Sequence, residues 1–230
     1  MEGTPPLIPV LVGLTVADDT TAWQAGGFTV GEDATCRIGA VTVTLVGREH
    51  GRGIRSWTLT GLALGATEID GVTTIAADAG EGDHRVGEAS ASGAAHPNGA
   101  ILIDHVVMTT PDPERTIASL EGAGLVHRRT RLADGHDQPM RQDFFRMGEV
   151  ILELIGPREP EPAHAHRPAR LYGLAHTVAD LDATADALRG RITTPKDAVQ
   201  TGRRIATLHT SDLDLSVPTA FLSPGRAALG

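Results

Sequence analysis

Two side chains in the second half of the chain, His105 and Glu153, are of types that could perform acid–base chemistry together. His105 lies in ILIDHVVMTT and Glu153 in GEVILELIGP, and both segments read as β-strands because they are nearly continuous apolar runs. Since side chains alternate along a strand, His105 shares a face with Val107, and Glu153 shares one with Ile151. We expect these strands to be neighbours, so that the imidazole and the carboxylate could touch.

The pair permits a structural and a functional interpretation. A buried carboxylate without a partner is costly, so Glu153 could simply form a hydrogen bond with His105. Alternatively, a carboxylate in apolar surroundings is suited to remove a proton from a substrate, because burial shifts carboxyl groups toward neutral pKa values. In that case Glu153 is a general base and His105 is its electrostatic partner.

The strand that carries Glu153 is one copy of a repeated segment. CRIGAVTVTLVG (Cys36–Gly47) returns as FRMGEVILELIG (Phe145–Gly156), and a looser version, VPTAFLSP, lies near the end of the chain. A repeat of this kind indicates one folding unit used several times. Glu153 stands where the first copy has Thr44 and the last has Ala220, so a single copy carries the carboxylate.

Each copy follows one order of elements, a strand, a helix and then strands. We predict strands at 10–16, 35–46, 55–64, 68–75, 101–110, 126–132, 142–147, 149–155, 170–178, 203–210 and 213–222. We predict helices at 18–25, 114–121 and 180–189. The fold class is therefore α+β, built from repeated β-α-β-β-β (βαβββ) units.

The predicted domains follow from these units. Residues 1–79 form one or two degenerate units, residues 80–99 are an exposed linker rich in Gly, Ala and Ser, and residues 100–226 contain two paired units. An exposed sheet edge needs a partner. For the N-terminal unit that partner could be residues 53–76, as a truncated fourth unit, or a second chain in a homodimer.

Composition excludes several classes of function. The 230 residues include 29 Asp and Glu against 20 Lys and Arg, giving a formal charge of −9, so no basic surface for nucleic acid or anionic membranes is expected. No apolar run is long enough to span a bilayer, and the single Cys36 cannot form an intrachain disulfide. We expect a cytoplasmic protein that binds a small molecule, without nucleic-acid or membrane partners.

Two polar passages could line the mouth of a binding site. RQD begins at Arg141, and PKDAVQTGRR ends at Arg204. Guanidinium groups bind anionic groups well, so Arg141, Gln142, Arg203 and Arg204 are candidate substrate-binding residues, and solvated turns are the alternative. Three further histidines fall in predicted loops and are expected to lie in solvent: His50, His84 and His96.

The tandem βαβββ units, the IDH phrase on a first strand and GEVILELIGP on a fourth strand together resemble the vicinal oxygen chelate superfamily, which includes glyoxalase I, extradiol dioxygenases and bleomycin resistance proteins. The resemblance covers residues 98–224 and, more faintly, 8–47. The passage 195–204 is similar to one in actinobacterial glyoxalase-like proteins. The resemblance implies cupped, mostly antiparallel sheets of paired units. It also implies a divalent metal (Zn, Ni, Fe or Mn), bound by the first and fourth strands of each unit.

By that resemblance, His105 and Glu153 are the metal ligands of the middle copy. The last copy has Gly173 and Ala220 at the corresponding positions, whereas catalytic zinc sites use three protein ligands. Two functions therefore stay open. The first is a glyoxalase-type lyase, isomerase or dioxygenase with Glu153 as base and His105 as ligand or partner. The second is a metal-free, non-catalytic protein that binds or sequesters a small ligand.

Overall fold

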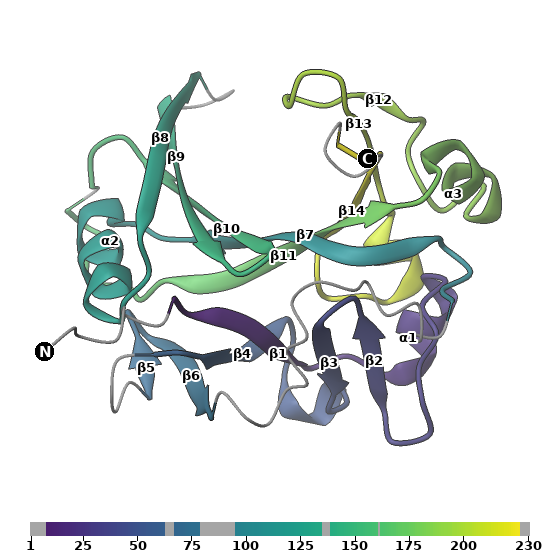
Figure 1. Ribbon diagram of the computed structural model, residues 1–230, viewed down its shortest axis with the longest axis horizontal. Helices are drawn as coiled ribbons and strands as arrows, with labels where there is room; N and C mark the ends of the chain where they lie inside the picture. Colours follow the sequence, from purple (N-terminus) through teal and green to yellow (C-terminus); the bar gives the residue numbers. More distant parts are fainter. Residues whose placement is uncertain (1–7, 63–66, 79–94, 135–138, 161, 226–230) are drawn as a thin grey trace, which may run out of the picture. The chain divides into compact units, whose positions relative to one another are not determined.

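The structure is a computed structural model and describes residues 8–62, 67–78, 95–134, 139–160 and 162–225 (Figure 1). The first strands and helix are β1 (Val10–Val16), α1 (Thr20–Ala25), β2 (Thr35–Ile38), β3 (Val41–Leu45), β4 (Ile54–Thr60), β5 (Glu68–Ile69) and β6 (Val72–Ala77). The middle segment contains β7 (Ala100–Thr109), α2 (Pro113–Gly122), β8 (His127–Asp134), β9 (Pro139–Met147) and β10 (Val150–Pro157). The last contains β11 (Arg170–Val178), α3 (Leu181–Ala187), β12 (Lys196–Asp197), β13 (Arg204–Thr207) and β14 (Thr219–Leu222).

The order of elements confirms the predicted α+β class with βαβββ units. β7, α2, β8, β9 and β10 form one unit, and β11, α3, β12, β13 and β14 form the next. The strands belong to a six-stranded sheet of order β2-β3-β1-β4-β6-β5 and an eight-stranded sheet of order β12-β13-β14-β11-β7-β10-β9-β8. Residues 80–94 of the predicted linker, with His84, lie outside the described residues.

Three predicted strands differ from the structure at turns. The segment 35–46 is a hairpin of β2 and β3, which are separated by a turn at Gly39 and Ala40. The segment 68–75 is a hairpin, because Asp70 and Gly71 separate β5 from β6 with φ angles of 46° and 84°. Such positive φ values at both central positions belong to the tight turns that Asp-Gly favours. The segment 213–222 starts with a 3-10 turn (Thr210–Leu213) and becomes a strand only at β14.

Contacts between residues divide the chain into two compact parts, called the first unit and the second unit, which do not coincide with the βαβββ units. The first contains residues 1–12, 56–85 and 107–171, and the second contains residues 13–55, 86–106 and 172–230. Glu153 therefore belongs to the first unit and His105 to the second.

The first unit is organised around β9, which pairs antiparallel with both β8 and β10. Residues alternate between its two faces, as β-structure requires. One face is fully buried and includes Phe145 and Met147 of β9 with Leu152 and Leu154 of β10. Helix α2 packs against β10, and its first turn is capped by the Asp112 carboxylate, which accepts a hydrogen bond from the Arg115 backbone N–H (3.1 Å). The opposite face of the strands is half-exposed.

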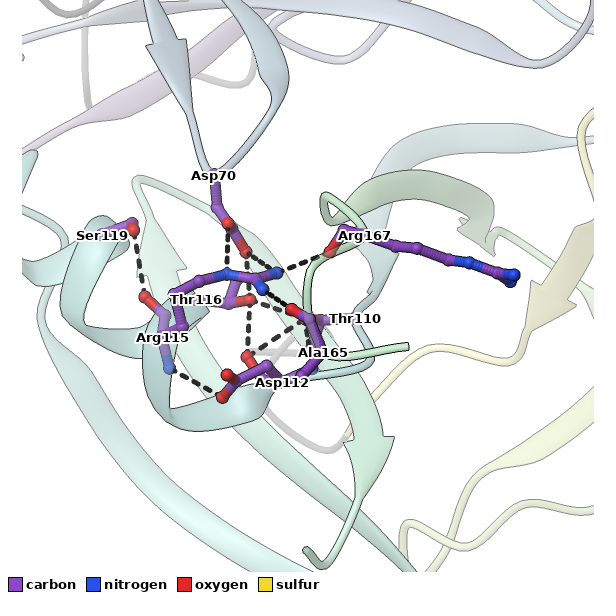
Figure 2. A network of polar contacts seen from close by, with 8 residues as sticks. All are labelled: Asp70, Thr110, Asp112, Arg115, Thr116, Ser119, Ala165 and Arg167. Carbon is purple, nitrogen blue, oxygen red and sulfur yellow. Dashed lines mark hydrogen bonds and ion pairs between the residues drawn. The ribbon is translucent and has the colours of Figure 1, made fainter. Parts of the chain in front are cut away.

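Arg115 fixes the β5–β6 turn to α2 (Figure 2). Its Nε donates to Asp70 Oδ1 (2.7 Å) and its Nη2 to Asp70 Oδ2 (3.1 Å), a two-pronged arrangement that suits a guanidinium and a carboxylate. Nη2 also donates to the carbonyl oxygen of Arg167 (2.7 Å), and Nη1 donates to that of Ala165. One side chain thus joins three segments that are far apart in the sequence.

The second unit contains two parallel strand pairs and a cluster of aromatic rings. β1 pairs with β3 and β11 pairs with β14, both in parallel. The Phe28 ring lies 4.9 Å from that of Trp23 and 5.1 Å from that of His176, and the His176 ring lies 5.7 Å from that of Phe221, measured between centroids. His176 is completely buried.

The expectation that His96 lies in solvent is wrong. The residue is only 9% exposed, its Nδ1 accepts a hydrogen bond from the Thr29 backbone N–H (3.0 Å), and its Nε2 lies 3.0 Å from the carbonyl oxygen of Arg37. Burial lowers the pKa of His96, against the opposing effect of the hydrogen bond to Arg37. Neighbouring Asn98 is fully buried and donates to the Gly26 carbonyl oxygen (2.9 Å), so this stretch is built into the second unit. His50 is exposed, as expected.

Candidate functional site

In the first unit, the half-exposed face of β8, β9 and β10 carries the predicted base. Strand partners share a face, so the register places Glu153 beside Phe144 and Ile155 beside Gln142, and it places Arg129 beside Phe144. The members of this face are Arg129, Arg131, Gln142, Phe144, Ile151, Glu153 and Ile155. A single carboxylate thus lies among apolar side chains, with two guanidinium groups on the edge strand β8.

Glu153 and Phe144 each have a defined neighbour on this face. The Gln142 Nε2 donates to Glu153 Oε1 at 2.8 Å, which orients the carboxylate. The Arg129 guanidinium lies over the Phe144 ring at 4.4 Å from its centroid, a cation–π arrangement. The face therefore offers an oriented acceptor, an aromatic surface and positive charge to a small ligand.

Arg141, another predicted substrate-binding residue, points to the other side of β9 from Gln142. Its Nε contacts Asp143 Oδ2 at 2.7 Å, and its Nη1 contacts Glu114 of α2. Burial opposes the charge of Arg141, but the hydrogen bonds to Glu114 and Asp143 outweigh it and raise the pKa. Asp143 is completely buried and also accepts from Thr130 Oγ1 (2.5 Å). In this structure Arg141 contacts the helix side, so Arg141 and Gln142 do not share a face.

In the second unit, His105 belongs to a polar cluster around Asp104. The His105 Nδ1 lies 3.0 Å from Asp104 Oδ1, while Thr177 Oγ1 (2.8 Å) and Arg203 Nη1 (2.7 Å) contact Asp104 Oδ2. Burial is the largest influence on Asp104 and opposes its ionisation. The hydrogen bonds from His105, Arg203 and Thr177, together with the Arg203 charge, outweigh burial and lower the pKa of Asp104 to about 2. The carboxylate is therefore ionised at neutral pH.

The two arginines of the passage 195–204 have different partners. Arg203 is only 12% exposed at its side chain and donates to Gln200, Ser223 and Thr177 as well as contacting Asp104. Arg204 is more exposed and pairs with Asp182 of α3 at 2.8 Å. The predicted substrate-binding arginines of this passage are thus both engaged with other side chains.

Gly173 has a structural reason to lack a side chain. A Cβ at this position would lie 2.9 Å from the carbonyl oxygen of Pro218, closer than real Cβ atoms approach. A histidine could not replace Gly173 without moving the backbone of β11 or its neighbour. The other corresponding position, Ala220, is half-buried beside Ala175 on β11.

A catalytic metal needs several donor side chains close together. Across the ranges that the structure describes, no three His, Cys, Asp or Glu side chains lie close enough together to hold a metal ion. Catalytic zinc sites use three protein ligands, so these residues do not fit such a site, and no chemical step is derived through a metal.

Sequence reasoning missed Asp104, Arg129 and Phe144. The strand alternation that paired His105 with Val107 could have placed Phe144 beside Gln142, because both follow the same period of two. The contacts of Asp104 with Thr177 and Arg203 join residues far apart in the chain, so they leave no local signal in the sequence. A pocket of about 540 Å³ next to the Asp70–Arg115 pair contains none of the predicted site residues.

A family model matches part of the sequence, and solved structures match the fold. The family model described as the Glyoxalase/Bleomycin resistance protein/Dioxygenase superfamily matches residues 104–207. The match covers somewhat less than half of the chain, and residues 104–207 are similar to this superfamily. No curated protein sequence matches the chain. None of the helices in the described ranges is long and apolar enough to cross a membrane.

Two solved structures are similar in fold to nearly the whole chain. A mutant of 4-hydroxymandelate synthase from Streptomyces coelicolor is 16% identical, with a TM-score of 0.62 over 96% of this chain and 93% of that one. A catechol 2,3-dioxygenase is 12% identical, with a TM-score of 0.58 and the same coverage. Methylmalonyl-CoA epimerase from Mycobacterium tuberculosis is 22% identical over 56% of this chain and 92% of that one, with a TM-score of 0.44. At these identities the likeness concerns the fold.

Proposed function

We propose that the protein binds a small organic acid on the half-exposed face of β8, β9 and β10, and that Glu153 removes a proton from it. The observation that carries the proposal is the Glu153 carboxylate, oriented by Gln142 at 2.8 Å among apolar neighbours. A base must be oriented toward the proton that it abstracts, and a fixed carboxylate meets that need. Arg129 and Arg131 supply positive charge for an anionic group, and the Phe144 ring supplies a surface for an apolar or aromatic one.

4-Hydroxymandelate is a suitable first probe. It combines a carboxylate, a neighbouring hydroxyl oxygen and an aromatic ring, which correspond to the arginines, the Glu153–Gln142 pair and Phe144. The name of one structural neighbour, 4-hydroxymandelate synthase, contains this compound, and a second neighbour is named for catechol. Catechol has an aromatic ring and two neighbouring hydroxyl oxygens but no carboxylate. Comparing the affinities of the two compounds therefore tests the contribution of the arginines, which would contact the carboxylate.

The experiment measures binding and proton removal separately. Isothermal titration gives the affinity for each probe, and proton NMR in D₂O follows loss of the α-proton of 4-hydroxymandelate. Glu153→Gln should reduce exchange by about 10²- to 10⁴-fold while the fold and binding persist. The control is Glu149→Gln, which makes the same charge change at an exposed residue near the β9–β10 turn and should leave exchange unchanged. Equal exchange rates in wild type and Glu153→Gln would refute the role of Glu153 as base.

A second candidate function is metal-free binding without catalysis. The close approach of Gly173 to the Pro218 carbonyl favours it, because that position cannot supply a ligand. It predicts that 4-hydroxymandelate binds to wild type and to Glu153→Gln without any α-proton exchange. Binding with no exchange would therefore select this function over the first.

Participation of a divalent metal is measured directly. Protein is incubated with zinc, nickel, iron(II) or manganese, dialysed and subjected to elemental analysis, with His105→Ala as the control. We expect no ion to be retained, since the described residues provide no group of three ligands. About one ion per chain, lost in His105→Ala, would contradict this and add a metal to the mechanism.

A further inference from the structure

Asp104 receives contacts from three directions. The His105 Nδ1 is 3.0 Å from its Oδ1, while Thr177 Oγ1 (2.8 Å) and Arg203 Nη1 (2.7 Å) approach its Oδ2. The Asp104 and Arg203 side chains are each only 12% exposed, so the ion pair is largely shielded from water. The carboxylate is thus held in one orientation by groups on β7, on β11 and just before β13.

The Arg203 guanidinium is itself held in place by hydrogen bonds. Its Nε donates to the Ser223 carbonyl oxygen (2.8 Å), its Nη1 to Gln200 Oε1 (2.8 Å) and its Nη2 to Thr177 Oγ1 (3.0 Å). A guanidinium has five N–H donors in a rigid plane, so partners on three sides fix both its position and its rotation. The charge that faces Asp104 is therefore part of the fold.

The orientation of Asp104 decides which nitrogen of His105 carries a proton. An ionised carboxylate can only accept hydrogen bonds, so the nitrogen that contacts it must be a donor. The contact is made by His105 Nδ1, which requires the proton on Nδ1 and leaves the Nε2 lone pair as the basic position of the neutral ring. The partner of one ring nitrogen commonly sets the chemistry of the other in this way.

We propose that Asp104 and Arg203 are positioning residues that hold His105 in the Nδ1–H tautomer with a fixed ring orientation. Arg203 orients Asp104, and Asp104 in turn orients His105. This gives Arg203, in the polar passage 195–204, a role in orienting His105 that does not involve contact with substrate. The tautomer does not depend on the proposed function, which places the base at Glu153.

The test reads the tautomer directly from the side-chain nitrogen shifts of ¹⁵N-histidine-labelled protein at mildly alkaline pH. Wild type should show His105 with a protonated Nδ1 and an unprotonated Nε2, favoured by about tenfold or more, as expected for a hydrogen bond to a charged group. In Asp104→Asn the amide oxygen must face the donors of Thr177 and Arg203. Its NH₂ then faces His105, so the preference should reverse to Nε2–H.

Two matched controls accompany this measurement. His96 has the opposite arrangement, with Nδ1 accepting from Thr29, so it should show Nε2–H in every variant and report that the second unit is folded. Arg203→Gln should reduce the preference of His105 for Nδ1–H. Arg204→Gln makes the same charge change one residue away, at an arginine paired with Asp182, and should not affect that preference.

Several results would overturn the proposal. One is an Nε2–H tautomer of His105 in wild type, and another is an unchanged Nδ1–H tautomer in Asp104→Asn with the His96 signal intact. If Asp104→Asn does not fold, Arg203→Gln decides: an unchanged His105 preference there refutes the role of Arg203 and with it the proposal. None of these readouts uses 4-hydroxymandelate or Glu153, so failure of the proposed function would leave the tautomer result unaffected.

Discussion

The buried ring of His176 should make the stability of the protein strongly dependent on pH. Burial is the main cause that lowers its pKa from 6.5 to about 3, with smaller contributions from the charges of His96 and His105 against the opposing charge of Asp104. Neither ring nitrogen of His176 has a hydrogen-bond partner among the described residues. The unfolded chain therefore binds a proton at this histidine below pH 6.5, whereas the folded chain does not until about pH 3.

The magnitude follows from this difference in proton binding. Each pH unit below 6.5 favours the unfolded state by about 1.4 kcal/mol, so lowering the pH from 7 to 5 should cost about 2 kcal/mol at this one residue. Stability is thus fully present above pH 6.5 and is lost progressively as the pH falls toward 3. For a domain with a free energy of unfolding of roughly 5–15 kcal/mol this is a large fraction.

Urea unfolding between pH 4.5 and 7.5 measures this effect in wild type and in His176→Leu. Leucine is similar in size to histidine and cannot bind a proton. The slope of the unfolding free energy against pH should therefore decrease by up to about 1.4 kcal/mol per pH unit, which corresponds to one proton. The slope is used because repacking can change the absolute stability by a comparable amount. His50→Leu is the matched control, since that side chain is 62% exposed. An identical slope in wild type and His176→Leu would refute the reasoning.

Two further predictions concern packing and reactivity. Gly173→Ala should destabilise the protein by about 1–3 kcal/mol in urea unfolding, because its Cβ would lie 2.9 Å from the Pro218 carbonyl oxygen. Cys36 is completely buried, and burial raises its pKa to about 12 from 9.0, so thiol titration with a disulfide reagent should show roughly a thousandfold less thiolate in the folded protein than in the unfolded chain.

Each of these two predictions would be contradicted by one specific result. Gly122→Ala, in α2 with nothing within 4 Å of the new Cβ, should be neutral or stabilising, and a loss there equal to that of Gly173→Ala would remove the steric explanation. Rapid modification of Cys36 in folded protein, at the rate seen in urea, would show that the thiol is accessible.

The elements of the fold were predictable wherever local pattern decides them. The strands 10–16 and 170–178 agree with β1 and β11 residue for residue, since continuous apolar runs bounded by turns mark buried strands. The hairpin at Asp70-Gly71 was missed although Asp-Gly is a turn signal, because the flanking residues read as one extended run. The grouping of residues 56–85 with 107–171 leaves no local signal, since it arises from contacts such as Arg115 with Asp70.

The site was predictable only in its residue types. Glu153 and Gln142, both chosen from their strands, lie on one half-exposed face and are joined by a hydrogen bond. The inclusion of Arg141 beside Gln142 overlooked that consecutive residues of a strand face opposite sides. The partners of Arg203 could not be read from the sequence, because they come from β7, β11 and the end of β14.

The contacts of Arg115 have a consequence for how this gene can be divided. Its partners Asp70, Ala165 and Arg167 lie on both sides of residues 79–94, a stretch that would otherwise be a natural place to cut. If the chain were divided there, one fragment would hold Asp70 and the other would hold Arg115, Ala165 and Arg167, so the ion pair between Asp70 and Arg115 would be lost in both. We expect them to be poorly soluble alone and to recover structure when co-expressed, which makes the protein a candidate scaffold for a split reporter.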